Sequence, residues 1–283
     1  MIRLAVIGDP IDHSLSPLVH STILKNLGID YEYEKVQVKK GELGSFLEYA
    51  KEKKFDGFNL TMPHKVDILP YLWEIDEEAE RYGAVNTVKV KNGKLYGYNT
   101  DADGYVQSIK TLGIEIDKKN VVIMGAGGVV QTLALKTALE GANEISIMNR
   151  TLSKAEEISK MVEVKTEKKC DFGGLEVVQL KEKMTNCHIL INATPLGMHS
   201  VNKDFEDLSF INELPKGAVV SDLIYNPQKT TLLKKAEQLG YKTINGLGML
   251  VFQAILADKI YLESDFDIKK IYDNVIEKIS SVI

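Results

Sequence analysis

Short apolar segments alternate with amphipathic segments along most of the chain. In the first hundred residues, strands are predicted at residues 4–7, 31–38 and 55–61. Helices are predicted at residues 16–27 and 41–53, the first opened by Ser16 as N-cap and Pro17 in its first turn. An Asn-Gly pair at residues 92–93 predicts a hairpin between strands at residues 87–90 and 94–98. This order fits a mostly parallel sheet with one antiparallel excursion.

A second series of alternating strands and helices begins near Asp117. Its predicted strands are residues 121–124, 144–148, 188–192 and 218–222, and its predicted helices are residues 129–139, 152–162 and 230–239. Two further helices, at residues 247–262 and 267–282, follow without a strand between them. Because helices alone do not extend such a series, we expect this tail to pack back on the first domain.

A glycine-rich turn follows the predicted strand at residues 121–124 and opens the next helix. It consists of Gly125, Ala126, Gly127, Gly128 and Val129. Glycines at such a turn let backbone N–H groups approach a pyrophosphate at the positive end of the helix. The pattern is close to the dinucleotide fingerprint, although not identical with it, and predicts a Rossmann-type domain. The alternative is a tight turn that binds nothing.

The residues after the next predicted strand distinguish between the two nicotinamide dinucleotides. An NAD site carries Asp or Glu there, whereas this chain has Asn149, Arg150, Thr151 and, one helical turn later, Lys154. Arg150 can pair with a 2′-phosphate, Lys154 adds positive charge, and Thr151 is expected to be the N-cap of the helix. The segment therefore favours NADP, the alternative being a solvated helix start.

Hydroxyl groups gather in two loops that follow predicted strands of the first half. Ser14 and Ser16 follow the first strand, and Thr61 ends the third. Open α/β sheets bind ligands at the carboxyl ends of their strands, and neutral donors suit a carboxylate or ring hydroxyls. For Ser16 the alternative is capping alone.

Lys65 follows a loop restricted by proline, and we expect it to pair with Asp101. Such a pair offers a donor to an alkoxide and a carboxylate that orients the donor. The alternative is an isolated surface lysine. For Asn86, which precedes another strand, the alternative is a turn residue, and the histidines are expected to be caps or surface residues.

Composition excludes several classes of protein. Of 283 residues, 44% are hydrophobic and 27% charged, as in an ordinary globular chain rather than a disordered one. A net charge of −5 argues against a general binder of nucleic acid or membrane surfaces. The two cysteines and five histidines show no metal-ligand spacing, so no metal is expected. Without a signal peptide or an apolar run of about 20 residues, the protein is expected to be cytoplasmic.

Eight motifs, in order, resemble the shikimate dehydrogenase family over essentially the whole chain. They are residues 8–17, 59–65, 83–87, 97–104, 149–151, 192–198, 222–227 and 245–254. The chain departs from the family at residues 129–132, where members often carry small residues and an Arg, and at Leu60 and Tyr261. It begins just before the first motif and ends after the tail helices, so no second pathway enzyme is expected to be fused to it.

The resemblance implies reversible, NADPH-dependent reduction of 3-dehydroshikimate to shikimate, a step in aromatic amino acid (chorismate) biosynthesis. It implies a substrate-binding and catalytic domain at residues 1–102 and 248–283 and an NADP-binding domain at residues 103–247. Lys65 and Asp101 would be the catalytic pair. The substrate would be held by Ser14, Ser16, Thr61, Asn86, Tyr225 and Gln253.

For the cofactor, the resemblance implies that Asn149, Arg150, Thr151 and Lys154 hold the 2′-phosphate and adenosine. The cofactor would also be bordered by Thr194, Leu223, Gly246 and Met249, with Gly246 near the nicotinamide. Two alternatives remain open: a quinate/shikimate dehydrogenase with broader substrate or NAD use, and a non-catalytic binding protein on the same scaffold. The expected partner is the small-molecule substrate, without nucleic acid or membrane, for a monomer or homodimer.

Overall fold

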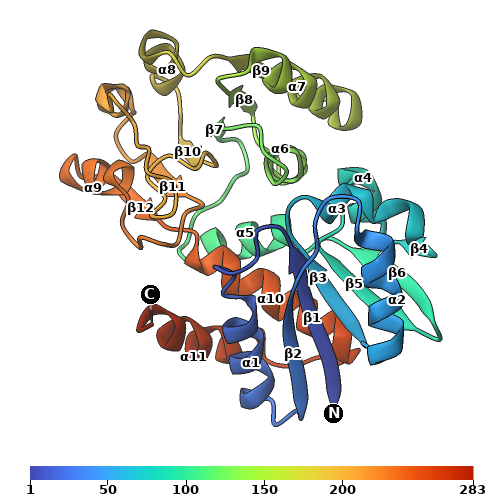
Figure 1. Cartoon of the computed structure of the whole chain (residues 1–283). Coiled ribbons are helices and arrows are strands. Elements are labelled where there is room, and N and C mark those ends of the chain that lie inside the picture. The colour runs from blue at the N-terminus through green and yellow to red at the C-terminus, as the bar shows by residue number, and fades with distance from the viewer. Residues whose placement is uncertain (283) are drawn as a thin grey trace. The chain divides into compact units, whose positions relative to one another are not determined.

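Two six-stranded sheets organise residues 1–282, the part of the chain that this computed structural model describes (Figure 1). One sheet belongs to a unit formed by Met1–Gly104 and Leu250–Val282, and the other to a unit formed by Tyr105–Met249. The chain leaves the first unit within α5 (Asp101–Lys110) and returns to it within α10 (Leu247–Leu262). The predicted α/β class, with the tail helices returned to the first unit, is confirmed.

The first sheet is mostly parallel with one antiparallel excursion, as predicted. Its order is β2 (Tyr31–Gln37), β1 (Ile2–Gly8), β3 (Gly57–Leu60), β5 (Thr87–Lys91), β6 (Lys94–Tyr98) and β4 (Glu74–Ile75). β1 is parallel to β2 and β3, whereas β5 is antiparallel to both β3 and β6. Asn92 and Gly93, with φ of 52° and 73°, form the turn that their sequence predicts.

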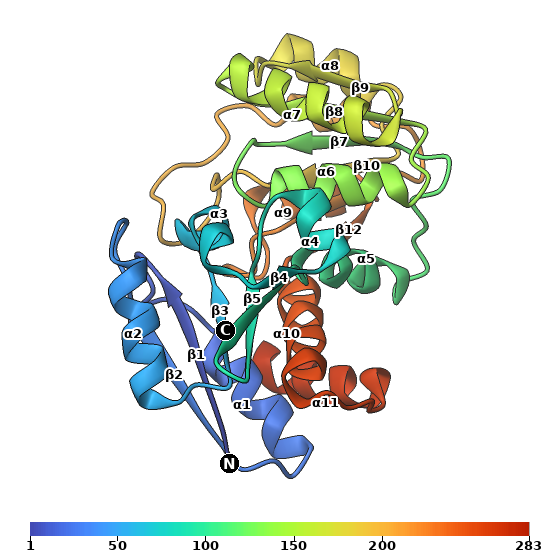
Figure 2. The same ribbon diagram turned by 90° about the vertical axis from the view of Figure 1, so that its right-hand side faces the viewer.

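Helices cover both faces of this sheet because successive side chains of β1 point to opposite sides. Leu4 packs with Leu24 of α1 (Ser16–Asn26) and with Ala257 and Tyr261 of α10. Ala5 and Ile7 face the other way, in a cluster that includes Phe46 of α2 (Leu43–Lys53). Figure 2 shows α10 and α11 (Ile268–Ser280) beside α1, which α11 contacts. Short helices α3 (His64–Asp67), η1 (Leu69–Tyr71) and α4 (Glu77–Tyr82) connect β3 to the hairpin.

The second sheet is entirely parallel. Its order is β12 (Lys242–Ile244), β11 (Val219–Asp222), β10 (Ile189–Asn192), β7 (Asn120–Met124), β8 (Glu144–Met148) and β9 (Cys170–Gly173). The connecting helices are α6 (Val130–Leu139), α7 (Leu152–Thr166), α8 (Val177–Met184), η2 (Ser209–Glu213) and α9 (Thr231–Gln238). From β7 the chain first adds β8 and β9 on one side of the sheet, and then adds β10, β11 and β12 on the other side. The strand order therefore reverses between β7 and β10, where such sheets bind ligands outside the carboxyl ends.

The prediction that Ser16 is an N-cap is wrong. Leu15 occupies the N-cap position, with φ −87° and ψ −2°, and no side chain caps the helix. Thr151 does occupy the N-cap position of α7, but its hydroxyl makes no capping hydrogen bond. The interpretation of the histidines is wrong for His20 and His64, which are fully buried and hydrogen-bonded to Asp258 and to the Val38 carbonyl.

No helix among residues 1–282 is long and apolar enough to cross a membrane.

Candidate active site

Several polar segments of the first unit meet at one edge of its sheet. β1, β3 and β6 end at this edge, whereas β5, which runs antiparallel to β3 and β6, begins there. Thr61 directly follows β3, Asn86 directly precedes β5, and Asp101 lies three residues after the end of β6. Strand direction alone therefore gathers residues that are 40 positions apart in the sequence.

Gly8 lets the two hydroxyl-rich loops approach each other. The N–H of Asp9 donates to the carbonyl of Met62 at 2.9 Å, which joins the loop after β1 to the loop after β3. A Cβ at Gly8 would lie 2.3 Å from Thr61 Cγ2 and 2.9 Å from the Met62 oxygen. Only glycine permits this contact. In the first loop, Ser14 and Ser16 lie together, with 3.2 Å between their hydroxyl oxygens.

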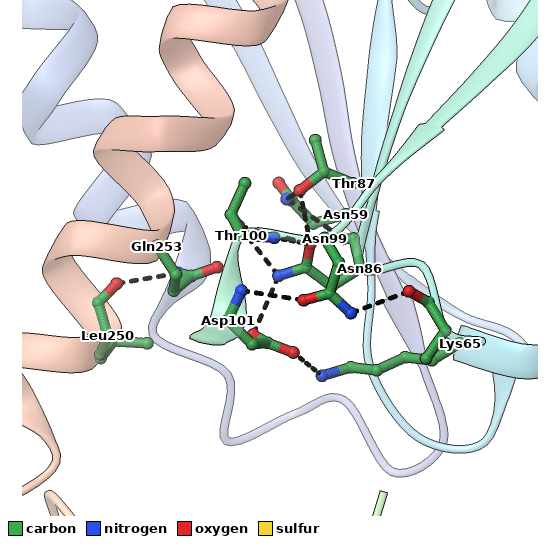
Figure 3. Close-up of polar contacts among 10 residues, drawn as sticks. Asn59, Lys65, Asn86, Thr87, Asn99, Thr100, Asp101, Leu250 and Gln253 are labelled. Carbon is green, nitrogen blue, oxygen red and sulfur yellow. Dashed lines mark hydrogen bonds and ion pairs between the residues drawn. The ribbon is translucent and has the colours of Figure 1, made fainter. Parts of the chain in front are cut away.

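Lys65 and Asp101 form an ion pair at the same edge (Figure 3). Lys65 Nζ lies 2.6 Å from Asp101 Oδ2, and the two side chains are 20% and 11% exposed. Lys65 is carried by α3, whose position is set by a hydrogen bond of 2.8 Å from the Val85 N–H to the Lys65 carbonyl. Asp101 begins α5, and its N–H donates to Asn99 Oδ1 at 3.1 Å. These hydrogen bonds fix the backbone positions of Lys65 and Asp101, and both side chains remain partly exposed.

Asn86 is a buried connector rather than an exposed turn residue. Its side chain is 2% exposed, and its Nδ2 donates to Asp101 Oδ1 at 2.9 Å and to Thr100 Oγ1 at 3.0 Å. Its Oδ1 accepts from the Thr100 N–H and from Thr87 Oγ1, each at 2.9 Å. Both oxygens of Asp101 therefore have a donor in the protein.

Gln253 reaches this site because α10 and α5 approach closely. A Cβ at Gly104 would lie 2.8 Å from both the Cβ and the N of Gln253. Since Gly104 and Asp101 are one helical turn apart, this contact places Gln253 beside the end of α5 that carries Asp101. Figure 3 shows Gln253 facing that end, and its Nε2 donates to the Leu250 carbonyl at 2.8 Å.

In the second unit, the glycine-rich turn has the shape of a phosphate cradle. Gly125 has a φ of 115°, and a Cβ there would lie 2.8 Å from the Ala193 carbonyl. Gly127 and Gly128 are exposed, and a Cβ at either would meet no atom within 4 Å. Val129 is the N-cap of α6, and no side chain caps this helix end. The turn therefore fits a pyrophosphate approached by backbone N–H groups.

A cationic loop follows β8 at the same edge of the second sheet. Asn149 is held by its N–H, which donates to the Gly173 carbonyl at 2.9 Å, and by its Nδ2, which donates to the Thr151 carbonyl at 3.0 Å. Arg150, Thr151 and Lys154 are exposed, and residues 149–154 contain no carboxylate. These donors fit a phosphate better than a ribose hydroxyl.

Asp222 anchors the loops that follow β10 and β11. It is fully buried and accepts hydrogen bonds from Thr230 Oγ1 at 2.7 Å, the Ile224 N–H at 3.0 Å and Asn192 Nδ2 at 3.1 Å. Burial raises its pKa to about 6 despite these donors. Asn192 in turn accepts from the N–H and the hydroxyl of Thr194, at 3.1 and 2.7 Å.

Leu223 and Gly246, two further expected cofactor residues, adjoin Asp222 and Asn192. The Leu223 N–H donates to the Asn192 carbonyl at 2.9 Å, and a Cβ at Gly246 would lie only 1.9 Å from the Leu223 carbonyl oxygen. Met249 lies in the first turn of α10 and is partly buried. Tyr225 lies in the loop after β11, and burial raises the pKa of its hydroxyl. It is the one expected substrate residue outside the first unit.

Sequence reasoning missed the side chains behind Asp101: Asn59, Thr87 and Thr100. All three are buried and hydrogen-bonded, directly or through one another, to Asn86. The available signal was a polar residue inside an otherwise apolar strand, Asn59 between Phe58 and Leu60. Among residues 1–282, no group of three or more His, Cys, Asp or Glu is placed to hold a metal ion.

Comparison with known proteins gives a consistent result. Residues 6–88 match the model of the shikimate dehydrogenase substrate binding domain, and residues 107–223 match that of shikimate / quinate 5-dehydrogenase. A shikimate dehydrogenase (NADP(+)) from Alkaliphilus oremlandii is 45% identical over 91% of this chain and 90% of its own.

Two solved structures show the same likeness. A shikimate dehydrogenase in complex with NADP+ superimposes with a TM-score of 0.88 at 40% identity, over 99% of this chain and 96% of its own. The ligand-free 5-ketofructose reductase of Gluconobacter sp. strain CHM43 follows with a TM-score of 0.84 at 35% identity, over 98% of both chains. Motifs, sheet topology and relatives agree, and the chain belongs to the shikimate dehydrogenase family.

Proposed function

We propose that this protein catalyses the reversible, NADPH-dependent reduction of 3-dehydroshikimate to shikimate in aromatic amino acid (chorismate) biosynthesis. The observation that carries this proposal is the Lys65–Asp101 ion pair, set among hydroxyl-bearing loops in a member of this family. A lysine can protonate the oxygen of a ketone that is being reduced, and an adjacent carboxylate can orient both the lysine and a neighbouring substrate hydroxyl.

The ketone oxygen gains negative charge during reduction, and Lys65 Nζ stabilises this charge and donates the proton. Asp101 holds Nζ at 2.6 Å through Oδ2 and has lone pairs left to accept a substrate hydroxyl. Ser14, Ser16, Thr61, Asn86 and Gln253 are proposed to hold the substrate, together with Tyr225. Ser14, Ser16 and Tyr225 would face the carboxylate of the substrate.

NADPH supplies the hydride when it is bound. The turn from Gly125 to Val129 would hold its pyrophosphate, because the cradle described above has room for phosphate oxygens beside backbone N–H groups. Asn149, Arg150, Thr151 and Lys154 would hold the adenosine and its 2′-phosphate. Thr194, Leu223, Gly246 and Met249 would border the cofactor, with Gly246 near the nicotinamide.

These roles divide the chain into two functional domains. Residues 1–102 and 248–283 are proposed to form the substrate-binding and catalytic domain, and residues 103–247 the NADP-binding domain. The relatives are named for a small-molecule reaction, and the net charge of −5 supports neither nucleic acid nor a membrane surface as a partner. We place the protein in the cytoplasm, as a monomer or homodimer.

The test is an assay of the purified protein with shikimate or quinate, each with NADP or NAD. The rate is followed by the absorbance of the reduced nicotinamide, and reduction of 5-ketofructose by NADPH is measured in parallel. Turnover that is much faster with shikimate and NADP than with any other combination is the expected result. Comparable rates with quinate or NAD would assign the protein to the broader-specificity branch of the family.

Two other outcomes would contradict the proposal. Faster turnover of 5-ketofructose than of shikimate would make the protein a ketosugar reductase, as one structural neighbour is. A rise in melting temperature with shikimate, without turnover in any combination, would show that the site binds but does not react.

A further inference from the structure

A chain of hydrogen-bonded side chains, all buried except the partly buried Tyr33, continues behind Asp101, on the side away from Lys65. Asn86 Nδ2 donates to Asp101 Oδ1 at 2.9 Å, and Thr87 Oγ1 donates to Asn86 Oδ1 at 2.9 Å. Asn59 Nδ2 donates to Thr87 Oγ1 at 3.1 Å, and the Tyr33 hydroxyl donates to Asn59 Oδ1 at 2.8 Å. Figure 3 shows Asn59, Thr87 and Asn86 stacked behind Asp101.

Two backbone groups fix the direction of these hydrogen bonds. The N–H of Thr100 faces Asn86 Oδ1 at 2.9 Å, so the NH₂ group of Asn86 must point to Asp101. The carbonyl of Asn86, which can only accept, faces Asn59 Nδ2 at 3.4 Å, so the NH₂ group of Asn59 points to Asn86 and Thr87. Asn59 Oδ1 therefore accepts from the Tyr33 hydroxyl, whose proton is retained because burial and the nearby charge of Asp258 raise the pKa of Tyr33 well above its ordinary value. Every hydrogen bond in the chain points toward Asp101.

The ring of Tyr33 is itself held in place. It stacks on the ring of His20, with 4.6 Å between centroids and 16° between planes. His20 is fully buried and its Nδ1 lies 2.7 Å from Oδ1 of Asp258, which is also fully buried. β2, α1 and α10 together therefore set the position of the Tyr33 hydroxyl, the first donor of the hydrogen-bonded side chains.

Stability of the sheet does not require this arrangement. Buried polar groups lower the stability of the fold unless each one is hydrogen-bonded. Apolar residues of similar volume would stabilise the interior of a strand at least as well. We propose that Tyr33 and Thr87 are positioning residues, which orient the Asn86 amide and through it the Asp101 carboxylate that holds Lys65. This inference rests on the proposed function and adds two residues to which that function assigns no contact with substrate or cofactor.

Thr87 provides the sharper test because two substitutions separate its hydroxyl from its methyl group. Thr87→Val keeps the shape of the side chain but removes its hydroxyl. Asn59 Nδ2 and Asn86 Oδ1 each lose one hydrogen-bond partner. Thr87→Ser keeps the hydroxyl and loses the methyl. We expect kcat for shikimate oxidation to fall about tenfold in Thr87→Val, with little change in the KM for NADP, and to stay near wild type in Thr87→Ser. The melting temperature is expected to fall in both.

Tyr33 has a matched control in the same cluster. Tyr33→Phe removes the first donor of the chain but keeps the ring on His20, and kcat is expected to fall severalfold. Tyr261→Phe removes another buried hydroxyl, one that has no hydrogen-bond partner among residues 1–282, and kcat is expected to stay unchanged. Turnover is calculated per folded molecule, from the melting curve of each variant, so that a loss of folded protein is not counted as a loss of kcat.

The outcomes distinguish this inference from the proposed function. A wild-type protein that oxidises shikimate, with Thr87→Val and Tyr33→Phe variants of unchanged kcat, would overturn the positioning role alone. Equal loss of kcat in Thr87→Ser and Thr87→Val would also overturn it, because packing rather than the hydroxyl would then be responsible. A wild-type protein without activity on shikimate would overturn the proposed function and this inference together.

Discussion

Single side chains decide the proposed chemistry at the edge of the first sheet. Lys65 and Asp101 are 36 residues apart in the sequence, and their pairing was a prediction made from residue types and loop positions. The orientation of Asn86 was not predictable, because a local sequence does not reveal whether an Asn before a strand faces solvent or a buried carboxylate. Only the Thr100 N–H, which the fold places beside Asn86 Oδ1, decides this.

Replacing Lys65 tests its proposed role as proton donor. Lys65→Met keeps most of the side-chain volume, and we expect kcat for shikimate to fall about 10²–10⁴-fold with little change in KM. Lys25→Met, which changes an exposed lysine at the end of α1, is the control. Near-normal turnover in the Lys65 variant would remove this residue from the chemistry.

Replacing Arg150 tests the choice of dinucleotide. In Arg150→Asp the proposed donor to the 2′-phosphate becomes a carboxylate that repels the phosphate and accepts from a ribose hydroxyl. We expect the ratio of kcat/KM for NADP to that for NAD to fall about a hundredfold. Lys160→Asp makes a similar change of charge on an exposed position of α7. An unchanged ratio in the Arg150 variant would refute its proposed phosphate contact.

Asp222 is expected to make stability depend on pH. Its pKa is raised from 3.8 to about 6 by burial, so the folded state binds a proton more tightly than the unfolded state. Its contribution is present below about pH 4 and is lost as the pH rises through about 6. Relative to Asp222→Asn, the free energy of unfolding of the wild type should fall by on the order of 3 kcal/mol across this window. Denaturant titrations at several pH values measure this difference, which would stay constant if Asp222 titrated normally.

Contacts between secondary-structure elements set the distances within the site. α5 and α10 touch at Gly104, where no side chain separates the backbones, and this contact brings Gln253 beside Asp101. A glycine in a helix normally costs stability, since its backbone is the most flexible when unfolded. Here the close approach of α10 to α5 explains why residue 104 is a glycine.

Gly104→Ala tests this contact. The new methyl group would lie 2.8 Å from Gln253 atoms, so α10 must shift. We expect a loss of about 1–3 kcal/mol of stability and a severalfold rise in the KM for shikimate. Gly44→Ala is the matched control, because it lies in α2 with its nearest neighbouring atom at 4.0 Å, and it should be neutral or slightly stabilising. Equal effects of the two substitutions would contradict the role of the close approach.

Hydrophobic periodicity predicted the central strands and most of the long helices but missed the short peripheral elements and two longer helices, α5 and α8. β9 and β12 are edge strands with partly exposed residues, and β4 has only two residues. Such strands form because a neighbouring strand offers backbone hydrogen bonds, rather than because of their own apolar pattern. The short helices α3 and α4 likewise contain too few turns to show a period.

For the molecule as a whole, the amino-acid sequence by itself determined the order of the central strands and most of the long helices, the hairpin at Asn92, the glycine-rich turn and the identity of the reactive groups. Each of these is a local property, because it depends on side-chain periodicity, on turn conformation or on chemical type. Tertiary structure alone decided the reversal of strand order between β7 and β10, the direction of the hydrogen bonds behind Asp101 and the burial of Asp222. These features depend on strands and helices distant in sequence, which meet only when apolar faces are buried together.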